Sequence, residues 1–179
     1  MDYRSVLNFW FEEIDSALWW KKDTGFDQLI CERFGSIHRQ AIQCELYPWR
    51  SQALGRLAEI IVLDQFSRNI FRASPESFAY DGISLALAQE AIAVGANEKL
   101  EPKQRAFLYM PFMHSESAAI HELAVKHFGE PGMNNNLEFE LKHKAIIDRF
   151  ARYPHRNELL GRESTPEELE FLKESGSSF

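Results

Sequence analysis

The sequence predicts an all-α protein, and three observations support this fold class. Apolar residues recur every three or four positions through most of the chain, which is the period of a helix with one buried face. Strict alternation of apolar and polar residues, typical of a half-buried strand, never lasts more than a few positions. β-branched residues do not cluster. At 179 residues the chain can bury one core, so we expect a single helical domain over 1–179 with a frayed end at 174–179.

The first half of the chain contains three predicted helices. The first is short and is marked by Val6, Phe9, Trp10 and Ile14. The second has a single apolar stripe with helical spacing, made of Phe26, Ile30, Phe34, Ile37 and Ala41. Thr24, with Asp27 three residues later, is its expected start, and Pro48 ends the region. Residues 54–62 are apolar nearly all round, which predicts a central, buried helix.

Glycine and proline place the helices of the second half. Residues 83–94 form an Ala- and Leu-rich helix with Gly95 as its cap, and Pro102 can open the next helix. A kink or a restart is expected at Pro111. A further apolar stripe is made of Phe139, His143, Ile146 and Phe150. The sequence TPEE at 165–168 predicts the last helix, with Thr165 as cap and Glu168 completing a capping box.

The overall charge and the cysteines limit the classes of partner. The formal net charge of -7 argues against nucleic acid, whose phosphates need a basic surface, and against docking on anionic lipid. Cys31 and Cys44 are isolated and have no metal-ligand spacing, which is typical of reduced thiols. The N-terminus has no basic, secretory-type start, and no window of eighteen apolar residues exists. We therefore expect a cytoplasmic protein that binds neither nucleic acid nor membrane, with its oligomeric state left open.

The first candidate site is the stretch LDQFSRNIFR at 63–72. On a regular α-helix its five hydrogen-bonding residues fall in one sector about 140° wide, opposite the apolar side chains. These residues are Asp64, Gln65, Arg68, Asn69 and Arg72. One interpretation is a salt-bridged helix face that begins with the Asp64–Arg68 pair. The other is a pocket wall, because two planar guanidinium groups flanked by amides suit a carboxylate or phosphate ligand.

Two further polar clusters could carry chemistry. In YMPFMHSESAAIHE at 109–122, His114 could meet Glu116 only in a distorted first turn after Pro111, and the alternative is a capping or core-edge histidine. In RYPHRNELLGR at 152–162, His155, Arg156 and Asn157 follow a proline and therefore lie in a turn. That turn is either a binding loop or a strut for the last helix.

Metal, cofactor and nucleophile motifs are not found in the sequence. His121 and His127 in HELAVKH are six residues apart, whereas the two-histidine zinc helix requires a spacing of four. No GxSxG, phosphate loop or GxGxxG occurs, so no metal and no cofactor is expected. The aromatic runs at 9–11 and 19–20 are most simply core anchors, although Trp19 and Trp20 could line a groove.

Four motifs in order, VLNFWF, LDQFSRNIFR, YMPFMHSE and PHRNELLGR, together resemble a bacterial family known only as a domain of unknown function. The resemblance runs from Val6 to about Leu172. It implies a tetratricopeptide-repeat-like, right-handed stack of antiparallel helical hairpins, and it implies no reaction. The matching residues are those of the three clusters. The family tends to carry proline where this chain has Ser67, which would make 64–72 a helix corner rather than a face.

Three functional hypotheses follow. The first is a binding module whose polar groove, built from all three clusters, holds a small anion or a peptide or protein carboxylate through Arg68, Arg72 and Arg156. The second is an enzyme in which His114 and Glu116 perform acid–base catalysis on an anionic substrate. The third is that the clusters are ion-pair latches that fix helix corners without binding anything.

Overall fold

The computed structural model describes residues 2–178, and within them every regular element is a helix, as the sequence predicts. Backbone contacts divide the chain into two compact units, one ending at Pro111 and the other beginning at Phe112. Each unit is described by itself below, and the single domain expected over 1–179 stays a prediction. None of the helices within residues 2–178 combines the length and the apolar character needed to cross a membrane.

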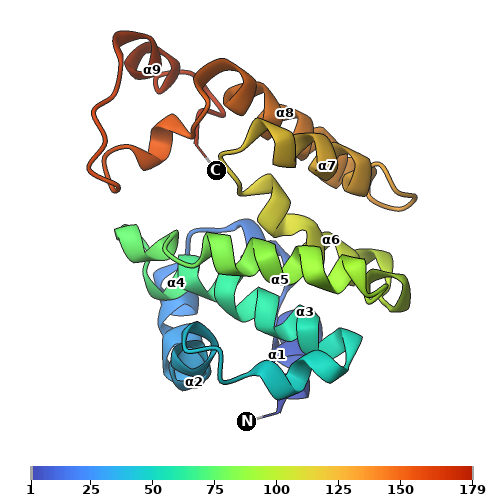
Figure 1. Ribbon diagram of the computed structural model, residues 1–179. Coiled ribbons are helices and arrows are strands. Elements are labelled where there is room, and N and C mark those ends of the chain that lie inside the picture. The colour runs from blue at the N-terminus through green and yellow to red at the C-terminus, as the bar shows by residue number, and fades with distance from the viewer. Residues whose placement is uncertain (1, 179) are drawn as a thin grey trace. The chain divides into compact units, whose positions relative to one another are not determined.

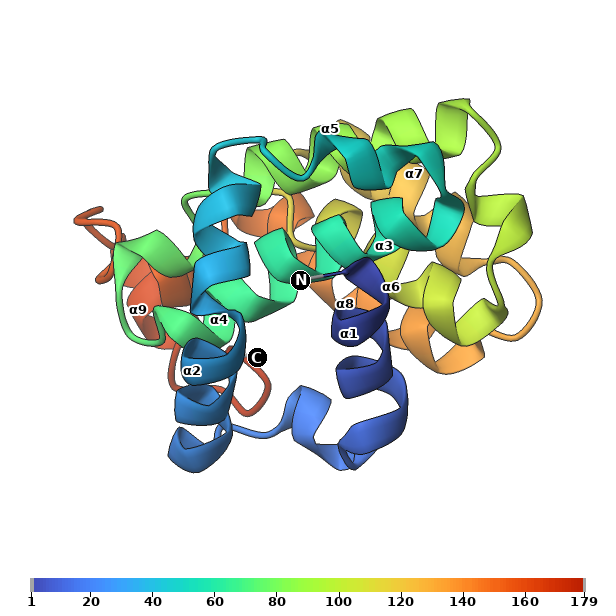
Figure 2. The same ribbon diagram turned by 90° about the horizontal axis from the view of Figure 1, so that it is seen from below.

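The N-terminal unit is built from five α-helices and the greater part of a sixth. These are α1 (Tyr3–Asn8), α2 (Thr24–Ile42), α3 (Ala53–Ile61), α4 (Ser67–Ile70), α5 (Asp81–Ala93) and α6 (Pro102–Met113). α3 and α5 pack side by side, as both ribbon views show (Figures 1 and 2). α2 packs against α4, so the first long helix of the chain supports the segment that carries the first polar cluster.

Most of the predicted helix ends lie where the local signals place them. Gly95 adopts a left-handed φ of 68° just after α5, and Pro102 is the first residue of α6. α2 begins at Thr24, but its cap is Asp23, whose carboxylate accepts the backbone N–H of Phe26. Pro111 lies inside α6, which continues to Met113, so the expected restart comes only after the helix has ended.

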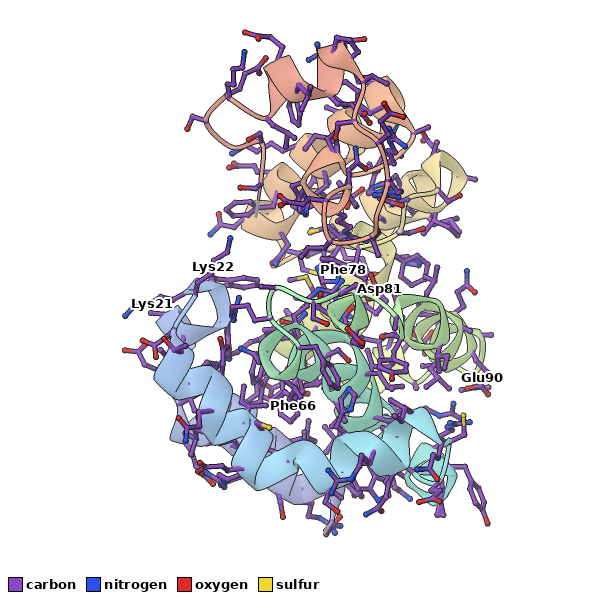
Figure 3. All side chains as sticks on the ribbon, turned by 90° about the vertical axis from the view of Figure 1, so that its left-hand side faces the viewer. Lys21, Lys22, Phe66, Phe78, Asp81 and Glu90 are labelled. Carbon is purple, nitrogen blue, oxygen red and sulfur yellow. The ribbon has the colours of Figure 1, made fainter. Side chains whose placement is uncertain are left out.

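Aromatic rings from three segments form the core of the N-terminal unit. The ring of Phe9 lies 4.8 Å from that of Phe34, and Phe34 lies 5.0 Å from Phe66. Trp10 meets Phe66 edge-on at 5.5 Å. Phe66 is fully buried and is labelled inside this unit in Figure 3. Large rings supply much apolar area per residue, which accounts for the aromatic-rich composition.

The C-terminal unit contains a helical hairpin followed by a short third helix. α7 (Ala118–Phe128) and α8 (Asn134–Phe150) lie side by side, and α9 (Pro166–Phe171) follows a 3₁₀ turn at Pro154–Arg156 (Figures 1 and 2). The capping box of α9 is confirmed: Thr165 Oγ1 accepts the N–H of Glu168, whose carboxylate accepts the N–H of Thr165.

The predicted stripe on α8 is only partly correct. Ile146 is buried in a core with Ile147, Tyr153 and Phe171. Phe139, by contrast, is 56% exposed, although its neighbour Glu140 is fully buried. Near the chain end, Ser177 is buried and its hydroxyl donates to the carbonyl of Leu172 at 3.1 Å. The fraying expected at 174–179 stays a prediction, and Phe179 lies outside the described residues.

Candidate functional site

The stretch 63–72 is a helix whose turns change type, rather than a regular α-helix. A π-helical turn at Val62–Phe66 joins α3 to α4, and Ser67 has ordinary helical angles, so the chain does not break there. Because a π turn widens the i→i+4 ladder, nearby carbonyl groups can accept side-chain donors. The Ser67 hydroxyl donates to the carbonyl of Leu63 at 2.5 Å, and Arg68 Nη1 donates to the carbonyl of Asp64 at 2.7 Å.

Arg68 forms a bidentate pair with an aspartate on another helix. Its Nη1 and Nη2 donate to the two carboxylate oxygens of Asp81 at 2.9 and 3.0 Å, and its guanidinium lies 5.8 Å from the ring centroid of Phe78. Figure 3 labels Phe78 and Asp81 close together at one edge of the unit. The expected Asp64–Arg68 pair is present at 3.4 Å, but Asp64 is fully buried and also accepts the Gln65 amide at 2.6 Å. The face therefore differs from an exposed row of surface charges.

Arg72 and Asn69 both bind Asp27, which lies on α2. Arg72 Nε and Nη2 donate to the Asp27 carboxylate at 2.5 and 2.7 Å, and the Asn69 amide donates to it at 2.8 Å. Asp27 is buried, and its negative charge raises the pKa of the Arg72 guanidinium. Three charge-assisted hydrogen bonds thus tie the end of α4 to α2.

Ser67 also has a buried partner, His38. His38 Nε2 lies 2.8 Å from Ser67 Oγ, and both residues are almost completely inaccessible to solvent. Because the hydroxyl proton of Ser67 is already donated to the carbonyl of Leu63, His38 Nε2 must carry the hydrogen of this bond. Burial, and secondarily the charge of Arg39, lowers the pKa of His38 to about 4, so the ring is neutral. This serine is therefore not an activated nucleophile, because the histidine donates to it.

In the C-terminal unit, Glu116 binds three donors. Arg162 Nη1 and Nη2 donate to its carboxylate at 2.7 and 2.9 Å, and the backbone N–H of Tyr153 donates at 2.7 Å. Burial raises the pKa of the Glu116 carboxyl, but the Arg162 and Tyr153 hydrogen bonds and the charge of Arg156 outweigh burial. Its pKa therefore lies below the ordinary value, and the group is an ionised anchor at neutral pH.

Two of the three residues at 155–157, His155 and Arg156, contact Tyr153. Arg156 is 5% exposed, its guanidinium lies 4.6 Å from the Tyr153 ring centroid, and its Nη2 donates to the carbonyl of His114 at 3.1 Å. The ring of His155 lies 5.6 Å from that of Tyr153. Asn157 is buried, and its amide donates to a serine hydroxyl at 3.0 Å. The structure thus brings His155 and Arg156 to Tyr153, and Arg156 to the backbone of His114.

A second polar network lies under the same tyrosine. His121 Nε2 lies 2.8 Å from the carbonyl of Ser115, which can only accept, so this nitrogen carries a hydrogen. Its Nδ1 lies 2.6 Å from the Glu140 carboxylate, so one proton is shared within this fully buried pair. Burial raises the pKa of Glu140 despite the opposing effect of His121. The Tyr153 hydroxyl donates to the carbonyl of Met113 at 2.5 Å.

The rings of His121, His143 and His155 all lie close to the ring of Tyr153, at 6.3, 5.9 and 5.6 Å between centroids. His143 donates from Nδ1 to the carbonyl of Phe139 at 2.7 Å, and burial lowers its pKa to about 3. The charges of His114, His121 and His155 lower the pKa of His143 further. Within residues 2–178, however, no group of three or more His, Cys, Asp or Glu side chains is arranged to hold a metal ion.

Comparison with known families gives the identity of the chain. Residues 6–176 match DUF924, described as a bacterial protein of unknown function. The chain belongs to the DUF924 family. This DUF924 chain is also similar to the solved structure of the protein of unknown function ATU0120 from Agrobacterium tumefaciens. The two chains are 35% identical, with a TM-score of 0.90 and 96% of each chain covered. A search of functionally curated proteins found no match.

The ten site residues singled out from the DUF924 sequence divide between the two units. Asp64, Gln65, Arg68, Asn69 and Arg72 belong to the N-terminal unit, whereas His114, Glu116, His155, Arg156 and Asn157 belong to the C-terminal unit. Within each unit the structure brings the predicted residues together through the contacts given above. A single groove built from all three clusters stays a prediction.

Sequence reasoning missed the partners of these residues. Asp27, Asp81 and Arg162 are bidentate partners of predicted residues, and Tyr153 lies at the centre of the C-terminal cluster. Asp27 was expected only to help start α2. Asp81 and Arg162 lie 13 and 46 residues from their partners, so local periodicity carries no signal for them. Arg162 was part of the PHRNELLGR motif, and that was the only indication of its importance.

Proposed function

We propose that this protein is a binding module for a small anion or a peptide carboxylate, and that its site is the cluster of His114, His155 and Arg156 in the C-terminal unit. One observation carries the proposal: Arg156 is immobilised, with its guanidinium against Tyr153 and its Nη2 on the carbonyl of His114. A guanidinium that is already held in place loses little side-chain entropy when a ligand binds.

The exposure of the neighbouring imidazoles supports this assignment. His114 and His155 are both partly accessible to solvent, whereas Arg156 is buried. A ligand coming from solvent would meet these partly accessible residues before it reached the buried guanidinium of Arg156. Histidine and arginine donors arranged in this way suit the oxygens of a carboxylate or phosphate group.

A different role is favoured for the 64–72 cluster. Arg68 and Arg72 each hold a carboxylate bidentately, on Asp81 and Asp27 respectively. A guanidinium occupied in this way has fewer donors for a ligand, and displacing its partner would leave a part-buried carboxylate without its cation. We therefore propose that these two arginines act as latches, and that anion binding does not use them.

The enzyme hypothesis is the weaker alternative. A general acid or base must exchange its proton near the working pH. Glu116 has a lowered pKa and three strong donors, two of them from Arg162, so its geometry favours anchoring over proton transfer. The catalytic roles expected for His114 and Glu116 stay predictions, and both residues are partly accessible to solvent.

The binding proposal can be tested by thermal shift and isothermal titration calorimetry. The probes are phosphate, citrate, acetate and a short peptide with either a free or an amidated C-terminus. A ligand at ten times its Kd stabilises the protein by about 1.4 kcal/mol, which raises Tm by roughly 3–6 °C. His155→Gln and His114→Gln, at partly exposed positions, should reduce this shift without unfolding the chain.

Matched controls separate binding from stability. Arg72→Gln should lower the Tm of the ligand-free protein and leave the ligand-induced shift unchanged. Arg33→Gln, which removes an exposed cation paired with Glu13, should change neither quantity. The proposal is wrong if no probe shifts Tm, or if Arg72→Gln abolishes a shift that both histidine variants retain.

Two broader expectations remain proposals. The tetratricopeptide-repeat-like, right-handed stacking is supported by the α7–α8 hairpin, which is the kind of unit that such folds repeat. An experimental structure of the full chain in solution or crystal would test it. A cytoplasmic location is consistent with the two exposed, unbridged cysteines, and imaging of a tagged chain in a bacterial cell would test that.

A further inference from the structure

An exposed aromatic surface lies on the N-terminal unit, on the segment before α2 and on α6. We call it the Trp20 patch, and it consists of Phe11, Trp19, Trp20, Lys22 and Lys103. Trp20 is 63% exposed, which is unusual for so large an apolar side chain. Its ring stacks nearly parallel on the buried ring of Phe107, with centroids 6.1 Å apart and an interplanar angle of 10°. One face of the indole is therefore held, and the rest of the ring is open.

A hydrogen bond and ring packing on Phe107 fix the aromatic side chains of the patch. Trp19 Nε1 donates to the carbonyl of Trp10 at 3.0 Å, and the Trp19 ring meets Phe107 edge-on at 4.9 Å. Phe11 packs edge-on against Phe107 at 5.6 Å. Rigid aromatic side chains lose little conformational entropy when a partner covers them, which is why such residues serve as anchors of protein interfaces.

The patch also carries positive charge that the fold does not neutralise. Lys21 pairs with Asp23 at 3.3 Å, but Lys22 makes no ion pair within residues 2–178. Lys103 Nζ lies 4.9 Å from the Trp19 ring centroid and 5.5 Å from that of Phe11, and it too has no carboxylate partner among the described residues. Figure 3 labels Lys21 and Lys22 side by side on the segment that precedes α2. In a chain of net charge -7, these two lysines are cations without an ion-pair partner in the described part of the chain, one near Trp20 in the sequence and one over the ring of Trp19.

We propose that the Trp20 patch is a docking surface for an acidic peptide segment of a protein partner, in which an aromatic or aliphatic side chain lies among the carboxylates. The apolar side chain would cover Trp20, and the carboxylates would pair with Lys22 and Lys103. Pairing a basic, aromatic patch with an acidic segment satisfies both kinds of group at once. This inference is independent of the anion site proposed in the C-terminal unit, because it uses different residues.

Charge decides between this occupant and two others. A nucleic acid or an anionic membrane is an extended polyanion, and the net charge of -7 would repel it over most of the surface. A short acidic peptide places its few charges beside the lysines. At physiological salt the remaining charges of the chain are screened beyond about 8 Å. A short peptide therefore feels mainly the attraction of the two lysines, whereas an extended polyanion also feels the repulsion of the acidic surface around them.

The test uses fluorescein-labelled synthetic peptides rich in Glu and Asp with one central Leu or Phe, titrated with the full chain by anisotropy. Each peptide has a counterpart in which Gln and Asn replace the acids. We expect the acidic peptides to bind and the neutral ones to bind at least roughly tenfold more weakly. Trp20→Ala should weaken binding by about thirtyfold, and Lys22→Glu and Lys103→Glu by roughly tenfold each.

Two matched controls address other exposed groups. Tyr47→Ala removes an aromatic ring that is 67% exposed, and Lys142→Glu reverses a lysine that lies 5.2 Å from the exposed ring of Phe139. Neither should change the affinity. Circular dichroism and Tm of each variant establish that the chain is folded.

Several results would overturn the proposal. One is equal affinity for acidic and neutral peptides, and another is unchanged binding by a folded Trp20→Ala variant. Binding of oligo-dT or of phosphatidylserine vesicles through the same residues, without peptide binding, would assign the patch to a polyanion instead. A Trp20-dependent dimer in sedimentation experiments, again without peptide binding, would assign it to a second copy of the chain.

Discussion

Removing the Ser67 hydroxyl tests whether the junction between the π turn and α4 is held by His38. In Ser67→Ala, His38 Nε2–H loses its acceptor at 2.8 Å in a site where His38 is 1% exposed and Ser67 is fully buried. An unsatisfied buried donor costs about 1–3 kcal/mol. The carbonyl of Leu63 also loses a donor. We therefore expect Ser67→Ala to lower the free energy of unfolding by about 2 kcal/mol near neutral pH.

The same contact has a pH dependence whose sign follows from burial. The pKa of His38 is lowered from 6.5 to about 4 in the folded protein, so between these values the unfolded chain takes up a proton that the folded chain does not. Stability contributed by neutral His38 is fully present above about pH 6.5 and is lost as the pH falls towards 4. A difference of this size corresponds to about 3 kcal/mol.

Urea unfolding followed by circular dichroism, repeated between about pH 7 and pH 4.5, measures both quantities. His38→Gln is the matched control, because its amide can donate to Ser67 but does not titrate. The stability difference between wild type and His38→Gln isolates His38, since His143 and the carboxylates titrate in both proteins. The reasoning is refuted if Ser67→Ala costs less than about 0.5 kcal/mol, or if His38→Gln loses as much stability as wild type over this pH range.

Three other predictions test the ion pairs and the helix packing. Arg72→Ala should lower the free energy of unfolding, measured with urea, by about 2–3 kcal/mol, because it leaves the buried Asp27 carboxylate without its cation. Arg33→Ala, at an exposed pair, should lower it by less than about 1 kcal/mol. Equal losses in the two variants would contradict the latch role of Arg72. The lowered pKa of Glu116 means that its stabilisation is present above the ordinary value of 4.5 and is lost as the pH falls below it, so Glu116→Gln should flatten the acid limb of the stability curve. Gly55→Ala should lower Tm, because the added Cβ would lie 2.1 Å from a backbone oxygen. Gly82→Ala, whose Cβ would meet no atom within 4 Å, should raise Tm, because alanine in a helix increases the free energy of unfolding by about 0.5–1 kcal/mol. The opposite order of the two Tm values would refute the packing argument.

The local features of this fold were predictable from neighbouring residues. The capping box at Thr165 and Glu168, the left-handed Gly95 after α5 and Pro102 at the start of α6 are all present as predicted. Each depends on the chemistry of a few adjacent residues and a backbone geometry that they favour by themselves. The stripe from Phe26 to Ala41 is buried for a similar reason, since helical spacing puts its members on one face.

The π turn at Val62–Phe66 could not be predicted in this way. Its residues include good helix formers, and a regular α-helix satisfied the same periodicity. The widened turn makes the carbonyls of Leu63 and Asp64 available to Ser67 and Arg68. The departure at Ser67 suggested a corner, but the structure keeps the helix continuous and uses the serine hydroxyl to satisfy a buried histidine.

The sequence by itself determined that the chain is helical and where several of its helices begin and end. It also singled out ten polar residues as a candidate site, and that assignment stays a prediction. Only the tertiary structure decided which partners those residues bind. In the folded chain Arg72 pairs with Asp27, 45 residues away, and Glu116 pairs with Arg162, 46 residues away. The physical reason is that a helix fixes the direction of a side chain but not its partner. The partner depends on which distant element packs against that face, and on whether burial there leaves a charge that must be paired.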